Sequence, residues 1–201
     1  MQSFTYGEKE LEYLKSKDKR LKKEIERIGK IEREVTGDLF AALVSSIVGQ
    51  QISMKAADTV WRRLNELAGE MTPERVAAMP KERLQSAGMS MRKTEYIQGI
   101  ARAVVNGEID LDALWGMTDE QVVGALVKLR GVGVWTAEML MIFSMQRKDI
   151  FSWDDLAIRR GLMMLHRHKE LPRERFERYR RRYSPYCSIA SLYLWEISLG
   201  K

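Results

Sequence analysis

The segment Leu129-Arg130-Gly131-Val132-Gly133-Val134-Trp135-Thr136-Ala137-Glu138 says more about the fold of this chain than any other segment. It follows an amphipathic helical stretch, residues 121–129, and runs directly into a second apolar helical stretch. Two glycines separated by one residue let the backbone turn tightly and approach another molecule closely. The first-turn N–H groups of the second helix have no partner within the helix and can bind an anion. The alternative is a glycine-rich corner between two helices that binds nothing.

Helical spacing of apolar residues continues on both sides of this corner. Near the N-terminus the repeating apolar residues are Leu11, Leu14, Leu21, Ile25 and Ile28, with Gly29 as the end of the stretch. Helix starts are marked by short polar capping residues at Asp38, Ser53, Thr72, Ser90 and Thr118. These signals predict about ten helices and no strand, so we expect an all-α protein.

Composition limits the class of protein and of partner. The chain has 201 residues, 34 Lys and Arg against 28 Asp and Glu, and a net charge of +6. A basic protein of this size suits a polyanion such as nucleic acid. The single cysteine, Cys187, excludes an internal disulfide and a site made of four cysteines. No apolar stretch reaches the length of a membrane span and charged residues follow the N-terminus, so we expect no membrane association and a cytoplasmic location.

Two adjacent acids follow about twenty residues after the corner. The segment from Asp149 to Gly161 contains Asp154 and Asp155, which precede a new apolar helix. One acid can cap that helix while its neighbour points elsewhere. The alternative is that both are ordinary capping residues.

Three motifs together resemble the helix–hairpin–helix base-excision DNA glycosylases. They are L-x-G-V-G-x-W-T-A at 129–137, x-D-D-L-x-x-R-R-G at 153–161 and I-V-G-Q-Q-I-S at 47–53, and the resemblance extends from about Phe40 to Trp195. Within this superfamily the chain is most similar to the bacterial 3-methyladenine DNA glycosylase II type. The resemblance implies a barrel-like helical lobe, residues 38–147, that ends in the hairpin. Residues 1–37 and 148–201 then form a second helical lobe, with the active cleft between the two.

The resemblance assigns the catalytic carboxylate to Asp155 and the helix cap to Asp154. Rupture of an N-glycosidic bond builds positive charge on the sugar, which an ionised carboxylate stabilises. Members of the superfamily that also cut the DNA strand carry a lysine that forms a Schiff base just before the position of Thr136. This chain has Trp135 there, which implies a monofunctional enzyme that uses water. The family branch with an iron–sulfur cluster has four C-terminal cysteines, so no cluster is expected here.

The same resemblance implies a pocket for the damaged base. Trp135 and Tyr186 match aromatic positions of the alkylpurine enzymes, where electron-rich rings hold a cationic base. Met139 replaces a tyrosine of the best-known relative, and Trp153 stands near a position where proline is common. We expect both side chains at the pocket, with a broader or differently tuned fit because methionine is soft and less directional. Core packing is the alternative for the aromatic rings.

DNA-binding roles follow from the resemblance at three further places. Gln51 falls at the position of the wedge that fills the gap left by the extruded nucleotide, although a capping role without DNA contact is the alternative. Gly131, Gly133 and Thr136 match the phosphate-binding hairpin. Relatives also bind a monovalent cation, Na⁺ or K⁺, through hairpin carbonyls. By position these carbonyls belong to Val127, Leu129 and Val132.

The predicted function is therefore a monomeric DNA glycosylase that removes alkylated purines, such as 3-methyladenine and 7-methylguanine, from double-stranded DNA in base excision repair. It would be cytoplasmic, and associated with the nucleoid when acting. One alternative is a glycosylase for uracil, a deaminated base or an oxidised base. The other is a DNA-binding module without catalysis, which would explain the two hairpin glycines but not Asp155.

Overall fold

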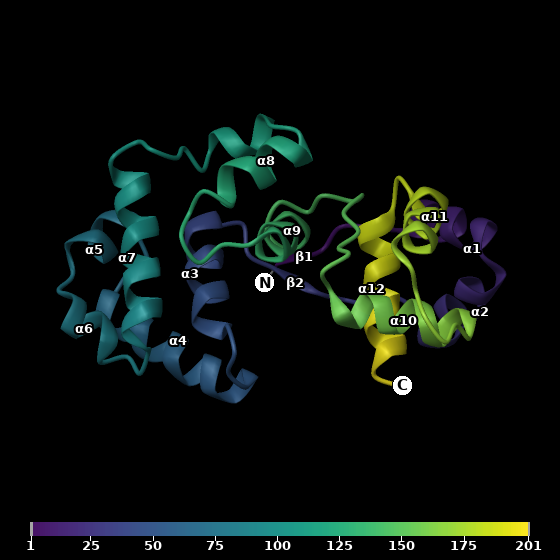
Figure 1. The fold of residues 1–201 in the computed structure, drawn as a ribbon, viewed down its shortest axis with the longest axis horizontal. Helices are drawn as coiled ribbons and strands as arrows, with labels where there is room; N and C mark the ends of the chain where they lie inside the picture. Colours follow the sequence, from purple (N-terminus) through teal and green to yellow (C-terminus); the bar gives the residue numbers. More distant parts are fainter. Residues whose placement is uncertain (1, 201) are drawn as a thin grey trace. The chain divides into compact units, whose positions relative to one another are not determined.

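The computed structural model describes residues 2–200; Met1 and Lys201 lie outside the described part (Figure 1). The chain divides into two compact units. Unit 1 contains Met1–Val35 and Met141–Lys201, and unit 2 contains Thr36–Leu140. The sequence analysis placed the borders at residues 38 and 147. The second border of the structure instead lies within a helix, α9 (Val134–Phe143), because its apolar residues continue past Leu140 without a turn signal.

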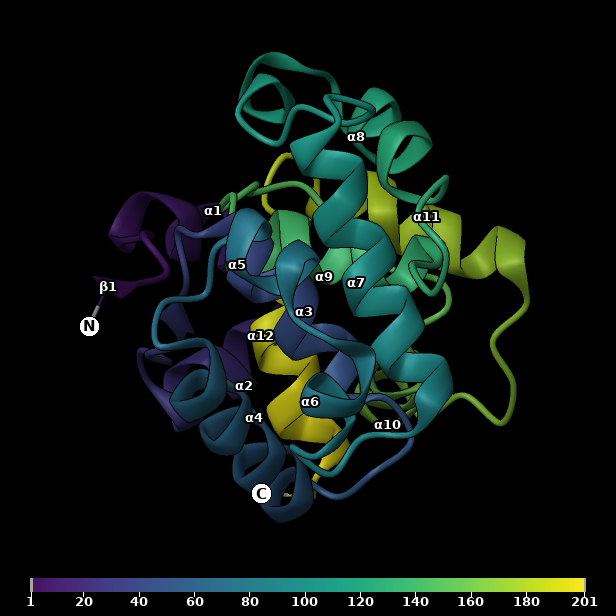
Figure 2. The same ribbon diagram turned by 90° about the vertical axis from the view of Figure 1, so that its left-hand side faces the viewer.

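Unit 2 is built around the buried helix α3 (Leu39–Gly49), which packs on α4 and α7, as Figure 2 shows. Its helices in order are α3, α4 (Met54–Ala68), α5 (Pro73–Ala78), α6 (Lys81–Gln85), α7 (Met91–Val105), the 3₁₀ turn η1 (Ala113–Gly116), α8 (Asp119–Leu126) and the start of α9. The predicted caps are confirmed, since the side chains of Asp38, Ser53, Thr72, Ser90 and Thr118 each accept a first-turn backbone N–H.

The central helix of unit 1 is α12 (Cys187–Ser198), which is almost entirely buried. The others are α1 (Glu8–Lys17), α2 (Lys19–Ile28), α10 (Leu156–His166) and α11 (Arg173–Tyr183). Helices α10 and α12 are in intimate contact at Gly161, where an added Cβ would lie 2.2 Å from the carbonyl oxygen of Leu194. Only a glycine fits there, because that oxygen belongs to the backbone and cannot rotate away.

The prediction of an almost wholly helical protein is confirmed, with one small exception. Gln2–Ser3 (β1) and Glu34–Val35 (β2) form a two-stranded antiparallel ladder, with Gln2 opposite Val35 and Ser3 opposite Glu34. Two residues per strand are too few to show the alternating pattern that identifies a strand in a sequence. None of the helices within residues 2–200 has the length and apolar character that a bilayer crossing requires.

The apolar repeat near the N-terminus forms two helices because Asp18 interrupts it. One oxygen of Asp18, Oδ1, accepts the N–H groups of Arg20 and Leu21 and starts α2. Its Oδ2 accepts hydrogen bonds from Tyr183 Oη at 2.9 Å and from an Arg182 nitrogen at 3.0 Å. The same oxygen lies 3.3 Å from His166 Nε2. Burial alone would raise the pKa of Asp18, but the hydrogen bonds from His166, Leu21 and Tyr183 hold this pKa well below its usual range.

Candidate active site

Asp155 is the N-cap of α10 and is buried, with 6% of its surface exposed. Its Oδ1 accepts the backbone N–H groups of Ala157 at 2.9 Å and Ile158 at 2.8 Å. Trp195 on α12 donates its indole N–H to the same oxygen at 3.2 Å. Three N–H donors and the positive end of the helix dipole fix the carboxylate and stabilise its negative charge.

The assignment of the helix cap to Asp154 is wrong. Asp154 is exposed, and the residue directly before the first helical residue, Leu156, is Asp155. Cap geometry requires the side chain immediately before the helix to fold back onto the second and third N–H groups. Asp155 therefore holds the cap position that had been assigned to Asp154, and its catalytic role stays a prediction.

Trp195 was not predicted from the sequence as a partner of Asp155. It is 40 residues from Asp155 in the chain, and its ring stacks on Phe143 with 5.4 Å between the ring centres. A tryptophan near the end of an apolar helix looks like core packing, and no local pattern marks it as the hydrogen-bond partner of a distant carboxylate.

The other predicted pocket residues of unit 1 pack against neighbouring side chains. Trp153 meets Phe176 edge to face at 5.1 Å, and the guanidinium carbons of Arg159 and Arg173 lie 4.3 and 4.9 Å from its ring centre. Tyr186 meets Tyr13 edge to face at 5.1 Å. Both rings are partly exposed, and their role at a base pocket stays a prediction.

In unit 2, the hairpin (residues 129–133) joins α8 to α9. Gly131 has φ +91°, and an added Cβ would lie 2.4 Å from Cδ2 of the Tyr96 ring, so glycine is required by the fold itself. Gly133 is different, because it is exposed and an added Cβ would meet nothing within 4 Å. Its missing side chain leaves open surface at the start of α9, the end of a helix at which first-turn N–H groups lack partners within the helix.

Side chains at the start of α9 differ in exposure. Trp135 is 42% exposed and Val134 44% exposed, whereas Thr136 is 4% exposed. Trp135 thus lies partly at the surface, while burial leaves little of the Thr136 side chain for phosphate. Met139 is partly exposed, one helical turn after Trp135. Of the three proposed cation ligands, the carbonyl of Leu129 already accepts the N–H of Val132 at 3.1 Å.

The wedge loop (residues 50–53) connects α3 to α4 and displays Gln51 on the surface. Gln51 has φ +57°, a left-handed conformation that is uncommon for a residue with a side chain. Ile52 is 41% exposed and Met54, the first residue of α4, is 85% exposed. These two apolar side chains were not predicted; the signal was their position beside Gln51, since apolar side chains also serve as wedges between bases.

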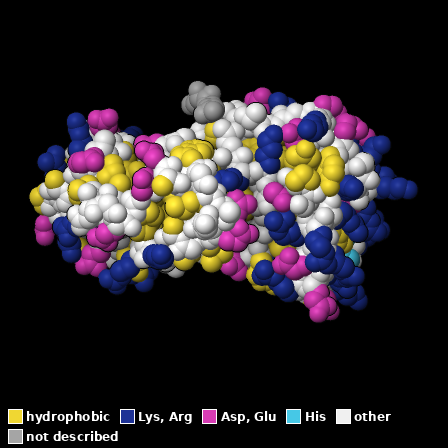
Figure 3. Space-filling view, turned by 90° about the horizontal axis from the view of Figure 1, so that it is seen from above, with side chains coloured by type: hydrophobic (Ala, Val, Ile, Leu, Met, Phe, Trp, Pro, Cys, Tyr) yellow, Lys and Arg dark blue, Asp and Glu magenta, His cyan; other side chains and the backbone are white. Residues whose placement is uncertain are grey.

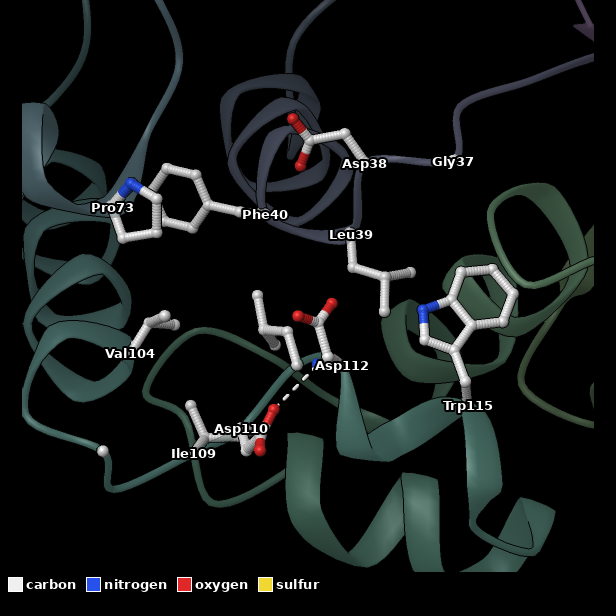
Figure 4. Close-up of a pocket in the computed structure, with 12 residues that line it drawn as sticks. Gly37, Asp38, Leu39, Phe40, Pro73, Val104, Ile109, Asp110, Asp112 and Trp115 are labelled. Atoms are coloured by element: carbon white, nitrogen blue, oxygen red, sulfur yellow. Dashed lines mark hydrogen bonds between the residues drawn. The ribbon is translucent and has the colours of Figure 1, made fainter.

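A cavity of about 600 Å³ in unit 2 has the wrong chemistry for DNA. Figure 4 shows the carboxylates of Asp38, Asp110 and Asp112 around it, with the apolar side chains of Phe40 and Leu39 between them. Carboxylates repel phosphate, so we do not assign this cavity to the nucleic acid. On the face drawn in Figure 3, Lys and Arg side chains are dense over unit 1.

Comparisons with known proteins agree with the geometry. Residues 44–185 match the model of the HhH-GPD superfamily of base excision DNA repair proteins. DNA-3-methyladenine glycosylase 1 of Schizosaccharomyces pombe is 31% identical over 164 residues, which are 79% of this chain and 72% of the relative. A crystal structure of DNA-3-methyladenine glycosidase from Bacillus halodurans has a TM-score of 0.87 and 35% identity, covering 98% of this chain and 93% of that one. The S. pombe 3-methyladenine DNA glycosylase Mag1 in complex with abasic DNA has a TM-score of 0.82 and 28% identity, covering 94% of this chain and 95% of that one.

Proposed function

Since the chain belongs to the HhH-GPD superfamily of base excision DNA repair proteins, we propose that it is a monofunctional DNA glycosylase that releases alkylated purines from duplex DNA. The names of its relatives support the 3-methyladenine class of substrate. The observation that carries the proposal is Asp155, a buried carboxylate held at a helix N-terminus by three N–H donors.

Asp155 acts on the sugar and not on the base. When the bond between C1′ and the purine nitrogen breaks, its electron pair leaves with the base and C1′ becomes electron-poor. The fixed carboxylate stabilises this positive charge without reorganisation. A water molecule then adds to C1′, and its proton passes to the carboxylate or to solvent. A purine alkylated at N3 or N7 departs as a neutral base, so the leaving group requires little acid catalysis.

Trp135 supports hydrolysis rather than strand cleavage. An indole cannot form a Schiff base with C1′, whereas the lysine expected here in a lyase can. Its exposure of 42% places the indole partly at the surface, as contact with a cationic base requires. Met139, Tyr186 and Trp153 complete the proposed pocket set.

Unit 2 supplies the grip on DNA in this proposal. The backbone amides of Gly131 and Gly133 and the first turn of α9 bind a phosphate. Gln51, with Ile52 beside it, enters the base stack after the nucleotide is extruded. The phosphate role of Thr136 and the monovalent cation at the carbonyls of Val127, Leu129 and Val132 stay predictions. We also propose a monomer that meets its substrate in the cytoplasm, at the nucleoid.

The test is base release from methylated duplex DNA by the wild type and by Asp155→Asn, with chromatography of the freed bases. We expect 3-methyladenine and 7-methylguanine from the wild type, little from the variant, and strands that stay intact until alkali treatment. Strand cleavage without alkali would contradict the monofunctional assignment. If no base is released from alkylated, deaminated or oxidised duplexes, the proposed glycosylase activity is wrong and the alternative of a DNA-binding module without catalysis is favoured.

A further inference from the structure

The wedge loop and the hairpin, distant in sequence, are joined by hydrogen bonds within unit 2. The side-chain nitrogen of Gln50 donates to the carbonyl oxygen of Gly131 at 2.9 Å. The ammonium of Lys93 donates to the carbonyl oxygens of Val48 at 2.7 Å and Gln50 at 2.6 Å. A single network therefore connects the end of α3, the loop that displays Gln51, and the hairpin.

Lys93 replaces the usual means of ending a helix. The last carbonyls of a helix lack intrahelical partners, and a glycine just beyond the end commonly satisfies them. Here α3 is followed by Gln50 and then by Gln51 in the left-handed conformation. The Lys93 ammonium donates hydrogen bonds to two of the nearby carbonyls, and its positive charge complements the negative end of the helix dipole. Burial, with Arg92 nearby, lowers the pKa of Lys93.

Helix α7 holds both functional segments at the same time. Lys93 and Tyr96 are three residues apart on α7, so their side chains leave the same face. Lys93 binds the end of α3, while the Tyr96 ring packs so closely on Gly131 that a methyl group could not be inserted. Gln50 closes the network directly between loop and hairpin.

We propose that Lys93 and Gln50 are positioning residues that set Gln51 at a fixed distance from the phosphate grip of the hairpin. This rests on the proposed function and adds to it the means by which the wedge acts. Extrusion of a nucleotide costs a few kcal/mol of stacking and pairing. A wedge residue on a mobile loop would be displaced by the bases instead of separating them. A loop that is hydrogen-bonded to the phosphate-binding hairpin keeps its position when the wedge residue enters the base stack.

The test compares Lys93→Met and Gln50→Met, which remove the donors, with Lys93→Arg, which keeps a charged donor. A matched control is Lys81→Met, because Lys81 is a lysine of unit 2 whose ion pair with Glu95 is exposed. Two duplexes are used: 7-methylguanine opposite cytosine, and 7-methylguanine opposite an abasic site, where less pairing must be broken. Single-turnover release and duplex affinity are measured on each, with thermal melting of every variant.

We expect Lys93→Met to slow release opposite cytosine by about 30-fold and Gln50→Met by about tenfold, the range for lost hydrogen bonds. Opposite the abasic site the release rates of both variants should lie within about threefold of the wild-type rate, because less base pairing must be broken before the nucleotide is extruded. Lys93→Arg and Lys81→Met stay near wild type. A purely structural defect would slow release equally on both duplexes, and that result would overturn the proposal.

A second readout does not depend on base release. Fluorescence of 2-aminopurine beside an abasic analogue reports unstacking when the protein binds. The wild type should raise this signal more than Lys93→Met and Gln50→Met do at saturating protein. Equal signals for all variants would overturn the positioning role. If the wild type releases no base while the difference in fluorescence persists, the proposed function fails and the positioning role stands.

Discussion

The two units differ in charge and in the way that each can hold DNA. Unit 1 has 23 basic and 15 acidic residues, a net charge of +8, whereas unit 2 has 11 basic and 13 acidic residues, a net charge of −2. Yet the hairpin and the wedge loop both belong to unit 2. In the proposed function, phosphate binding there depends on backbone N–H groups and a helix dipole, which the net charge does not report.

Many cations of unit 1 are already engaged inside the unit. Arg182 pairs with Asp18, Arg180 with Asp149 and Arg33 with Glu196. The net charge of +6 therefore indicated a polyanion as partner but did not show which residues bind it.

The largest effect is expected at the carboxylate of unit 1. Asp155→Asn should lower single-turnover base release by about a thousandfold, because an uncharged amide cannot stabilise positive charge on the sugar. Asparagine is as good an N-cap as aspartate, so the melting temperature should change little. Affinity for an abasic duplex should also stay close to wild type. A variant with nearly full activity would remove Asp155 from the chemistry.

The next effect concerns the core of unit 1. Gly161→Ala forces a Cβ to within 2.2 Å of the Leu194 carbonyl oxygen, and we expect a loss of about 3 kcal/mol or more in the free energy of unfolding. The matched control is Gly99→Ala in helix α7, where an added Cβ meets nothing and should stabilise by about 0.5–1 kcal/mol. Urea unfolding measures both. Equal changes would mean that α10 and α12 can separate without cost.

Asp18 of unit 1 should contribute to the pH dependence of stability, together with Glu10, whose pKa is lowered to about 2 by the hydrogen bond from Lys148. The pKa of Asp18 is lowered in the folded protein, so its contribution is full above the unfolded pKa of about 4 and is lost as the pH falls toward the folded pKa. Asp18→Asn should cost about 2 kcal/mol near pH 7, because Arg182 loses its buried partner, and progressively less below pH 4. Denaturant unfolding from pH 7 to pH 2 measures this. A pH-independent cost would assign the effect to packing.

The smallest effect separates the two hairpin glycines of unit 2. Gly133→Ala should leave the melting temperature unchanged and weaken binding to an abasic duplex by about tenfold, because the new methyl group stands where a phosphate approaches. Gly131→Ala should instead destabilise the fold, since φ is +91° and the Tyr96 ring fills the space. Fluorescence anisotropy and thermal melting check both. Unchanged binding by Gly133→Ala would move the phosphate contact elsewhere.

Predictions that rest on short-range patterns agreed with the structure. Each cap at Asp38, Ser53, Thr72, Ser90 and Thr118 was predictable, because a capping side chain bonds to N–H groups two or three residues away. The assignment of the cap to Asp154 failed because it depended on a boundary of one residue. Trp195 and Lys93 were not predictable, since their hydrogen bonds cross 40 and more residues of chain.

Local patterns of residues were enough to predict that the chain is helical, where most helices begin, and that it contains a glycine corner and an acid that match the motifs of DNA glycosylases. Periodicity, caps and motifs are local, so they can be recognised without knowledge of the fold. Only the tertiary structure decided that Asp155 is the cap, that Trp195 binds it, and that α7 ties the wedge loop to the hairpin. These depend on helices that meet from distant parts of the chain, and no short pattern encodes such a meeting.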